Sequence, residues 1–159
     1  MAKKKADPDK VLIASNRKAK FHYEIFDVIE AGLCLKGPEV KSLRDSNARL
    51  EGAFARLDGN EVYLYNLYIA PYKHNTGEDI EPDRTRKLLV HRREIEKFRK
   101  GIDQKGLNLV AIELYFKKGW AKVSIALAKG KRGSDKRDSL KKKAQSRELE
   151  RSFKGKFKF

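Results

Sequence analysis

The residues of this sequence whose types and spacing could do chemistry are its basic side chains, above all those near the C-terminus. Residues 129–159 hold thirteen Lys and Arg side chains against four carboxylates. Such a segment repels itself and has little apolar surface to bury, so we expect it to be disordered in isolation. Its chemistry is phosphate binding, because each cation that neutralises a phosphate releases a condensed counterion. The sequence therefore predicts a polyanionic partner, with nucleic acid as the first candidate.

Smaller basic clusters lie in the first 128 residues. One runs from Asn16 to Lys20, and another pairs Lys41 with Arg44 at a helical spacing of three. These clusters fit phosphate contacts, but they equally fit solvated faces of helices and loops, and the spacing leaves both interpretations open. The candidate RNA contacts of the body are Asn16, Arg17, Lys18, Lys41, Arg44, Arg84 and Lys87.

Glu30 is the acidic candidate beside these cations. A carboxylate in a basic face can accept hydrogen bonds from exocyclic amines or 2′-hydroxyl groups, or it can orient a neighbouring Arg. An ordinary bend residue would look the same in the sequence, so both interpretations stay open.

Catalytic and metal-binding motifs are not found. The histidines His22, His74 and His91 form no HExxH or His–Cys cluster, so no metal site is predicted. Cys34, the single cysteine, has an apolar context unsuited to a thiolate nucleophile and has no partner for a disulfide within the chain. Neither a GxSxG motif nor a P-loop occurs. We therefore expect no enzymatic activity and no cofactor.

The elements that position these residues are predicted to be mostly strands. A first strand is expected around Tyr23–Val28, with a bend or bulge at Glu30–Gly32. Pro38 is well placed at the start of a short helix over Glu39–Arg44. Asp58, Gly59 and Asn60 predict a hairpin turn. The later strands are expected at Ala53–Leu57, Glu61–Tyr68, Leu107–Phe116 and Ala121–Ala128.

A polar loop over residues 73–86 precedes the one long helix predicted for the body. Leu88, Leu89, Ile95 and Phe98 lie at helical spacing. Five or six strands, a late helix and no βαβ alternation argue against a parallel doubly wound sheet. The predicted fold class is mainly β with short helices, an OB-like antiparallel β-barrel with a disordered basic C-terminal tail.

The chain of 159 residues suits one domain with extensions. We expect a flexible basic N-terminal arm over residues 1–12, an RNA-binding barrel over 13–128 and the basic tail over 129–159. Residues 139–154 lack Pro and Gly, but the apolar stripe is thin, so a helix there is expected only on a bound partner. No run of eighteen apolar residues occurs, and we expect a monomeric cytoplasmic protein without a membrane span.

Short motifs in order, from about Ile13 to Arg151, resemble the bacterial family of SsrA-binding proteins, also called small protein B. They are Asn16–Ala19 with Tyr23–Ile25, Glu30–Gly32, Gly37–Arg44, Arg84–Leu89, Lys122–Val123 and Ala128–Arg132 with Asp135–Arg137. The resemblance implies an OB-like barrel that binds the tRNA-like domain of transfer-messenger RNA (SsrA RNA) and delivers it to stalled ribosomes. It also implies that the protein stands in for the anticodon arm of tRNA during this rescue, called trans-translation.

The resemblance assigns roles to two groups of residues. Asn16, Arg17 and Glu30 match the family's RNA-binding face. The tail is expected in the vacant mRNA channel near the decoding centre of the small subunit. Its matching positions are Lys129, Gly130, Lys131, Arg132, Asp135, Lys136 and Arg137.

The sequence departs from the family pattern at two places, and two rival functions stay open. Phe21 stands at the family's usual His position, with His22 beside it, and Pro38 replaces a residue that is often Thr or Trp. The main alternative is a generic OB-fold protein that binds single-stranded nucleic acid. A ribosomal or assembly protein with a basic extension is the second.

Overall fold

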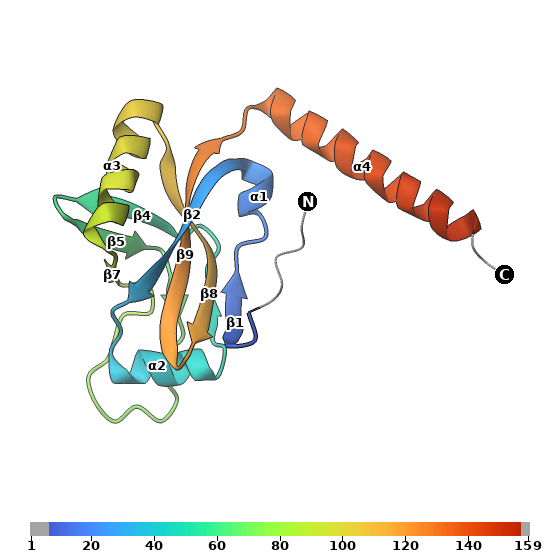
Figure 1. The fold of residues 1–159 in the computed structure, drawn as a ribbon. Coiled ribbons are helices and arrows are strands. Elements are labelled where there is room, and N and C mark those ends of the chain that lie inside the picture. The colour runs from blue at the N-terminus through green and yellow to red at the C-terminus, as the bar shows by residue number, and fades with distance from the viewer. Residues whose placement is uncertain (1–6, 157–159) are drawn as a thin grey trace.

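A ring of antiparallel strands forms the centre of the computed structural model, which describes residues 7–156 and the side chains of 7–152. The strands pair in the order β1-β8-β4-β5-β7-β2-β9, and β8 also pairs with β9, so the sheet closes on itself (Figure 1). The predicted OB-like fold is confirmed. The strands are β1 (Lys10–Ser15), β2 (Tyr23–Leu33), β3 (Ala48–Arg49), β4 (Phe54–Asp58), β5 (Glu61–Tyr65), β6 (Tyr68–Ile69), β7 (Arg86–Leu89), β8 (Asn108–Lys117) and β9 (Trp120–Gly130).

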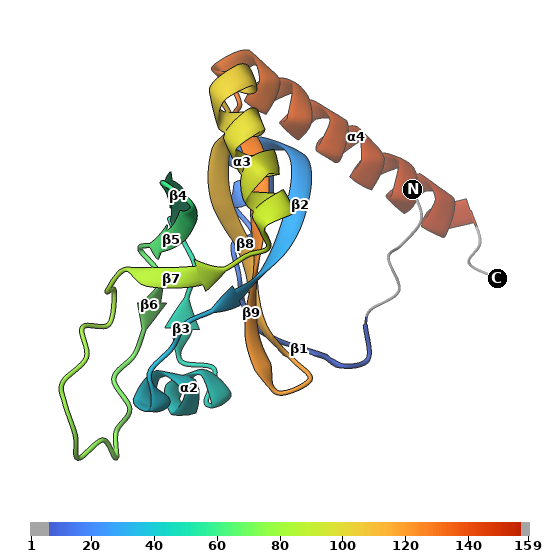
Figure 2. The same cartoon turned by 60° about the vertical axis from the view of Figure 1, so that its left-hand side comes forward.

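Helices lie around the ring and beyond it. Strands β3 and β6 form a separate two-stranded sheet. Figures 1 and 2 show α2 at one end of the barrel, while α4 leaves from the opposite end and runs away from it. The helices are α1 (Ala19–His22), α2 (Gly37–Arg44), α3 (Arg92–Lys105) and α4 (Gly133–Lys156).

The core fills the inside of the ring, because alternate residues of each strand point inward. Leu64, Leu114, Val123 and Ile125 are fully buried there. Helix α3 adds Phe98, which is also fully buried, and α2 adds Leu43.

A second, smaller hydrophobic cluster lies outside the ring, where α1 covers the start of β8 and the end of β9. Ala19 of α1 packs with Val110, Ile112, Ala126 and Ala128. These strands are therefore buried on both faces at this end, while their other end keeps one face open.

The local turn chemistry follows the sequence. The predicted hairpin between β4 and β5 is present, with Gly59 at a positive φ of 57°. Strands β8 and β9 are joined through Lys118 and Gly119, at φ values of 50° and 80°, as expected for a tight hairpin turn. Helix α2 begins with Pro38 in its first turn, as predicted.

Four sequence predictions for the body are wrong. The single strand expected over Glu61–Tyr68 is two strands, β5 and β6, which belong to different sheets. Leu88 and Leu89 belong to strand β7 instead of the helix, which begins only at Arg92. Strand β2 runs unbroken through Glu30–Gly32, and its irregularity lies between Ile25 and Asp27. A first strand, β1, precedes the predicted ones and pairs with β8. It includes residues 10–12 of the predicted N-terminal arm, and residues 1–6 of that arm lie outside the described residues.

The predicted tail begins inside the sheet. Strand β9 continues to Gly130, which pairs with Tyr23, and the backbone N–H of Lys131 donates to the carbonyl of His22 at 2.9 Å. From Gly133 the chain is one helix whose Leu140 and Leu149 are more than half exposed. The side chain of Phe153 lies outside the described residues. Disorder of the tail in isolation stays a prediction.

Candidate nucleic-acid interface

Asn16, Arg17 and Lys18 lie at the corner where β1 turns into α1. The side chain of Asn16 is buried and holds this corner, since its Oδ1 accepts from the N–H of Ala19 at 3.1 Å and its Nδ2 donates to the carbonyl of Ala111 at 3.4 Å. Arg17 and Lys18 are exposed, and Lys18 forms an ion pair with Glu51 at 2.5 Å. Asn16 therefore positions the two cations beside it instead of presenting its own amide to solvent.

The tail begins next to this corner. Lys131 donates from its Nζ to the carbonyl of Lys20 at 3.1 Å and to Ser139 Oγ at 3.4 Å, which ties the start of α4 to α1. Asp135 accepts from the backbone N–H of Arg132 at 3.1 Å and places a carboxylate in the first turn of α4, where the helix dipole favours it. Lys129, Arg132 and Arg137 are exposed.

A hollow of about 660 Å³ lies between this corner, strand β4 and the start of the tail. Lys18, Arg56, Lys131 and Lys136 supply cations to its lining. Phe54, also in the lining, stacks on Tyr65 with ring centroids 5.3 Å apart, and Arg56 covers both rings. We call the corner and this hollow the tail corner, defined by residues 16–23, Phe54, Arg56 and residues 129–137.

An open face lies at the other end of the barrel, on the outer side of β1, β2, β7, β8 and β9. Residues directly opposite each other in paired strands point to the same side of a sheet. The register pairs Leu12 with Tyr115, Tyr115 with Lys122, Lys122 with Gly32, and Gly32 with Leu89, so one row crosses all five strands. Lys117 pairs with Trp120, two residues closer to the hairpin turn than the pair of Tyr115 and Lys122.

This open face combines charges with exposed apolar side chains. Leu12 is 53 % exposed, Val28 46 %, Leu89 56 % and Trp120 73 %. Isolated exposed apolar residues are ordinary, but several on one face mark an interaction surface. We call this surface the sheet face, and its residues are Leu12, Val28, Glu30, Leu89, Lys117, Trp120 and Lys122.

Gly32 leaves the centre of the sheet face without a side chain. A Cβ at this position would lie 3.1 Å from the Cβ of Leu89, closer than ordinary van der Waals contact. The glycine therefore leaves space for the side chain of Leu89 next to β2. Since no side chain stands between them, Leu89 and Lys122 are both accessible on this side of the sheet.

Glu30 is the acidic centre of the sheet face. Its Oε2 accepts from Tyr115 Oη at 2.5 Å and lies 3.6 Å from Lys117 Nζ, and its Oε1 lies 4.0 Å from Lys122 Nζ. The hydrogen bond from Tyr115 and the charges of Lys117 and Lys122 hold the pKa of Glu30 below its ordinary value despite partial burial. Burial and the same hydrogen bond raise the pKa of Tyr115 to about 12. The carboxylate is therefore ionised at neutral pH and keeps free lone pairs for donors on a ligand.

Replacing Tyr115 with phenylalanine is expected to lower the free energy of unfolding by about 1 kcal/mol at pH 7, the usual size for a net hydrogen bond. Because the folded pKa of Glu30 lies below the unfolded one, this stabilisation is complete above about pH 4.5 and is lost as the pH falls through the folded pKa. Urea unfolding of both proteins at pH 7 and at pH 2.5 measures it. An equal loss at both pH values would contradict the hydrogen bond as its source and indicate altered packing.

Lys41 and Arg44 lie apart from both surfaces, whereas Lys87 borders the sheet face, because it shares the exposed face of β7 with Leu89. Lys41 and Arg44 are exposed on α2, and Lys41 Nζ lies 5.5 Å from the centre of the Tyr72 ring. Lys87 on β7 forms an ion pair with Glu61 of the neighbouring strand β5. Lys41 and Arg44 remain available to a polyanion, but the fold does not gather them with Asn16, Arg17 or Glu30.

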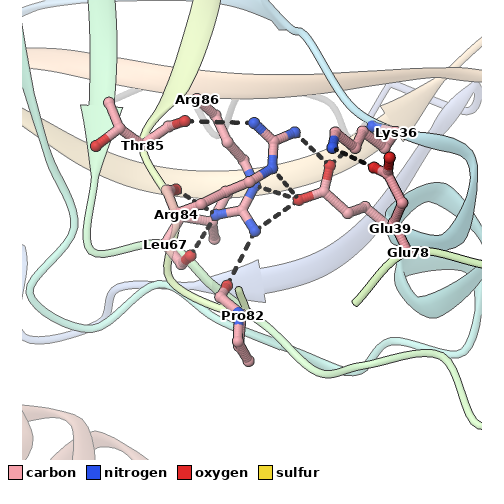
Figure 3. A network of polar contacts seen from close by, with 8 residues as sticks. All are labelled: Lys36, Glu39, Leu67, Glu78, Pro82, Arg84, Thr85 and Arg86. Atoms are coloured by element: carbon pink, nitrogen blue, oxygen red, sulfur yellow. Dashed lines mark hydrogen bonds and ion pairs between the residues drawn. The ribbon is translucent and has the colours of Figure 1, made fainter. Parts of the chain in front are cut away.

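Arg84 belongs to a buried polar network next to α2 (Figure 3). Its Nη2 lies 2.6 Å from Glu39 Oε2, while Arg86 approaches Glu39 Oε1 at 2.8 Å. Arg86 is fully buried and also donates to the carbonyls of Leu67, Arg84 and Pro82. The network joins the loop before β7 to α2, so the guanidinium of Arg84 is already occupied by Glu39.

The fold thus splits the predicted site residues among several places. Asn16, Arg17 and Lys18 meet the start of the tail, whereas only Glu30 lies on the sheet face. Sequence reasoning missed Leu12, Leu89, Trp120 and Lys122 as members of one surface. Trp120 had a signal, since an aromatic residue directly after a Lys-Lys-Gly turn lies at a hairpin end.

The described part of the chain has neither a cluster of metal ligands nor a helix that could span a membrane. No group of three or more His, Cys, Asp or Glu side chains could hold a metal ion there. No helix within residues 7–156 has the length and apolar character to cross a membrane.

Comparison with known proteins agrees with this geometry. The sequence profile of a family described as SmpB protein matches residues 13–155. An SsrA-binding protein of Elusimicrobium minutum is 47 % identical over 159 residues, covering all of both chains. One from Aquifex aeolicus is 51 % identical over 150 residues, covering 93 % of this chain and 96 % of its own.

Solved structures extend the likeness to the fold. A chain of the structure described as "tmRNA-SmpB: a journey to the center of the bacterial ribosome" superimposes with a TM-score of 0.63 at 45 % identity. The match covers 79 % of this chain and 92 % of the other.

Proposed function

This chain belongs to the SmpB family of SsrA-binding proteins, and from that premise we propose that it binds the tRNA-like domain of transfer-messenger RNA and delivers it to stalled ribosomes for trans-translation. The observation that carries the proposal is the separation of two surfaces along strand β9. Trp120 of the sheet face begins this strand, and Gly130 at the tail corner ends it. At about 3.3 Å per residue the two ends lie roughly 33 Å apart.

The sheet face is the proposed RNA-binding surface of the barrel. Lys117 and Lys122 supply phosphate contacts, and the ionised Glu30 accepts hydrogen bonds from 2′-hydroxyl groups or exocyclic amines. The exposed Leu12 and Leu89 fit against sugars and base edges. Folded RNA is recognised largely by its shape. A surface that combines charged and apolar side chains in this way can contact both the backbone and the bases of such an RNA.

Residues 129–137 of the tail corner and helix α4 are the proposed ribosomal surface, while Asn16, Arg17 and Lys18 on the barrel side of this corner are candidates for transfer-messenger RNA. Helix α4 leaves the barrel at the end opposite α2, so a partner can surround it while the sheet face stays bound (Figure 2). The cations of Lys131, Arg132, Lys136 and Arg137 fit the rRNA phosphates around the decoding centre, with the tail in the vacant mRNA channel. The protein then stands where the anticodon arm of tRNA would stand.

The remaining parts of the proposal concern its class and organisation. It assigns binding and no catalysis, which agrees with an RNA-binding family. It places a monomer in the cytoplasm, where ribosomes are found. It divides the chain into an N-terminal arm that ends before β1, a barrel, and a tail that begins after Gly130. The RNA-binding candidates are Glu30 on the sheet face and Asn16, Arg17 and Lys18 at the tail corner, with Lys41, Arg44, Arg84 and Lys87 as further candidates.

Competition binding tests the proposal against a generic single-strand binder. A folded tRNA-like RNA is expected to displace a labelled copy of itself about tenfold or more better than random single-stranded RNA at physiological salt, a difference of about 1.4 kcal/mol. Replacing Lys122 with alanine should weaken binding and lower the salt slope by about one, while Lys100→Ala on α3 is the matched control. Equal affinities for the two RNAs would favour the alternative. Ribosome binding without transfer-messenger RNA would favour a ribosomal protein.

A further inference from the structure

Trp120 is the most exposed large apolar side chain in the described part of the molecule. It is the only tryptophan of the chain and is 73 % exposed. It stands at the start of β9, directly after the turn formed by Lys118 and Gly119, whose positive φ values fix a tight hairpin end. A rigid turn therefore holds an indole ring in water at the edge of the sheet face.

Lysines flank Trp120 in the sequence and in the register of the hairpin. Lys117 is its register partner across the hairpin, and Lys122 lies two residues further along β9, so both share its face. Lys117 Nζ is 3.3 Å from Asp7 and 3.6 Å from Glu30. Lys118 is exposed, and no ion pair involves it among residues 7–152. The hairpin end therefore presents one aromatic surface between ammonium groups, a pattern complementary to a base with its flanking phosphates.

We propose that Trp120 stacks on an unpaired base of the RNA bound at the sheet face, with Lys118 and Lys117 on the adjoining phosphates. The inference rests on the proposed function and adds a base-stacking residue to it. An unpaired base fits because the indole is exposed on a tight turn and because every base has a π-face. The lysines select against a neutral or cationic partner.

The single tryptophan makes the test direct, because all intrinsic indole fluorescence reports this site. Adding the folded tRNA-like RNA is expected to quench the emission and to protect the indole from acrylamide, with a midpoint equal to the Kd from filter binding. Replacing Trp120 with alanine should weaken binding about 5- to 150-fold. Trp120→Phe should recover part of this loss, whereas Trp120→Leu, which keeps apolar area without a π-face, should not.

Matched controls separate stacking from other causes. Val11→Ala removes an exposed apolar side chain that pairs with Phe116, one position away from the row of the sheet face, and should bind RNA as the wild type does. Thermal melts of each variant check folding, which an exposed residue should hardly change. Tight RNA binding with unchanged indole emission, or equal affinities of the leucine and wild-type proteins, would overturn the inference and leave the proposed function intact. Failure of the wild-type protein to bind the RNA would instead overturn the proposed function.

Discussion

Replacing Glu39 with alanine is expected to lower the free energy of unfolding by about 3–5 kcal/mol, the cost of leaving a buried charge without its partner. Glu39 is 4 % exposed and accepts from Arg84, Arg86 and the backbone N–H of Lys36. Arg86 is fully buried, so the alanine variant would leave its guanidinium in the interior with carbonyl partners alone. The loss is a large fraction of the roughly 5–15 kcal/mol by which an ordinary domain is stable.

The pH dependence follows from the same contacts. Burial opposes ionisation of Glu39, but the hydrogen bonds from Arg84 and Lys36 and the charge of Arg86 outweigh it and hold the pKa below its ordinary value. The stabilisation is therefore complete above the unfolded pKa and is lost as the pH falls through the folded one. Wild-type stability should fall towards that of the variant in strong acid.

Urea unfolding of a small set of variants measures this network. Glu78→Ala removes only an exposed ion pair with Lys36 at 3.4 Å and should change the free energy by about 0.5 kcal/mol or less. Glu39→Gln keeps one carbonyl acceptor and should fall between wild type and alanine. Combining Glu39→Ala with Arg86→Met should cost less than the sum of the two, because each removes the other's partner. A Glu39→Ala variant as stable as Glu78→Ala would contradict the structural role of the network.

The same network explains why the sequence predicted the wrong element for β7. Arg86 and Leu88 are buried while Lys87 and Leu89 are exposed, so the strand alternates with a period of two. In the sequence Arg86 looks like an exposed polar residue, so the alternation of buried and exposed positions is hidden. Without that alternation, Leu88 and Leu89 fit the helical spacing of the residues that follow. The neutralising carboxylate, Glu39, lies 47 residues earlier, where no local pattern can show it.

Local turn chemistry was predictable because it depends on adjacent residues. The Asp58–Asn60 turn and the helix with Pro38 in its first turn both appear in the structure. The sheet face was not predictable, because it arises from the register of five strands. Leu12, Gly32 and Leu89 are far apart in the chain and meet only in the closed sheet. The resemblance to known proteins placed Glu30 at the RNA-binding surface, but its hydrogen bond with Tyr115 depends on the fold.

Removing the tail is the second change with a large expected effect, here on the tagging of peptides. Ending the chain after Arg132 should abolish tagging of peptides on stalled ribosomes while the affinity for tRNA-like RNA stays within about threefold. The cut removes ten Lys and Arg side chains and four acids, but it leaves the sheet complete, since Gly130 still pairs with Tyr23 and Lys131 still donates to His22. Helix α4 carries Leu140 and Leu149 largely in solvent, so its loss should cost the barrel little stability.

A cut after Ala128 is the informative comparison. It removes Lys129 and Gly130 as well, and with them the last two pairs between β2 and β9. That variant should melt at a lower temperature than the Arg132 cut, although both lack the helix. Filter binding, thermal melts and a reconstituted translation reaction on an mRNA without a stop codon measure the three properties. If the Arg132 cut destroyed RNA binding while melting normally, the tail would contribute directly to the RNA interface, and the separation of the sheet face from the tail corner would be wrong.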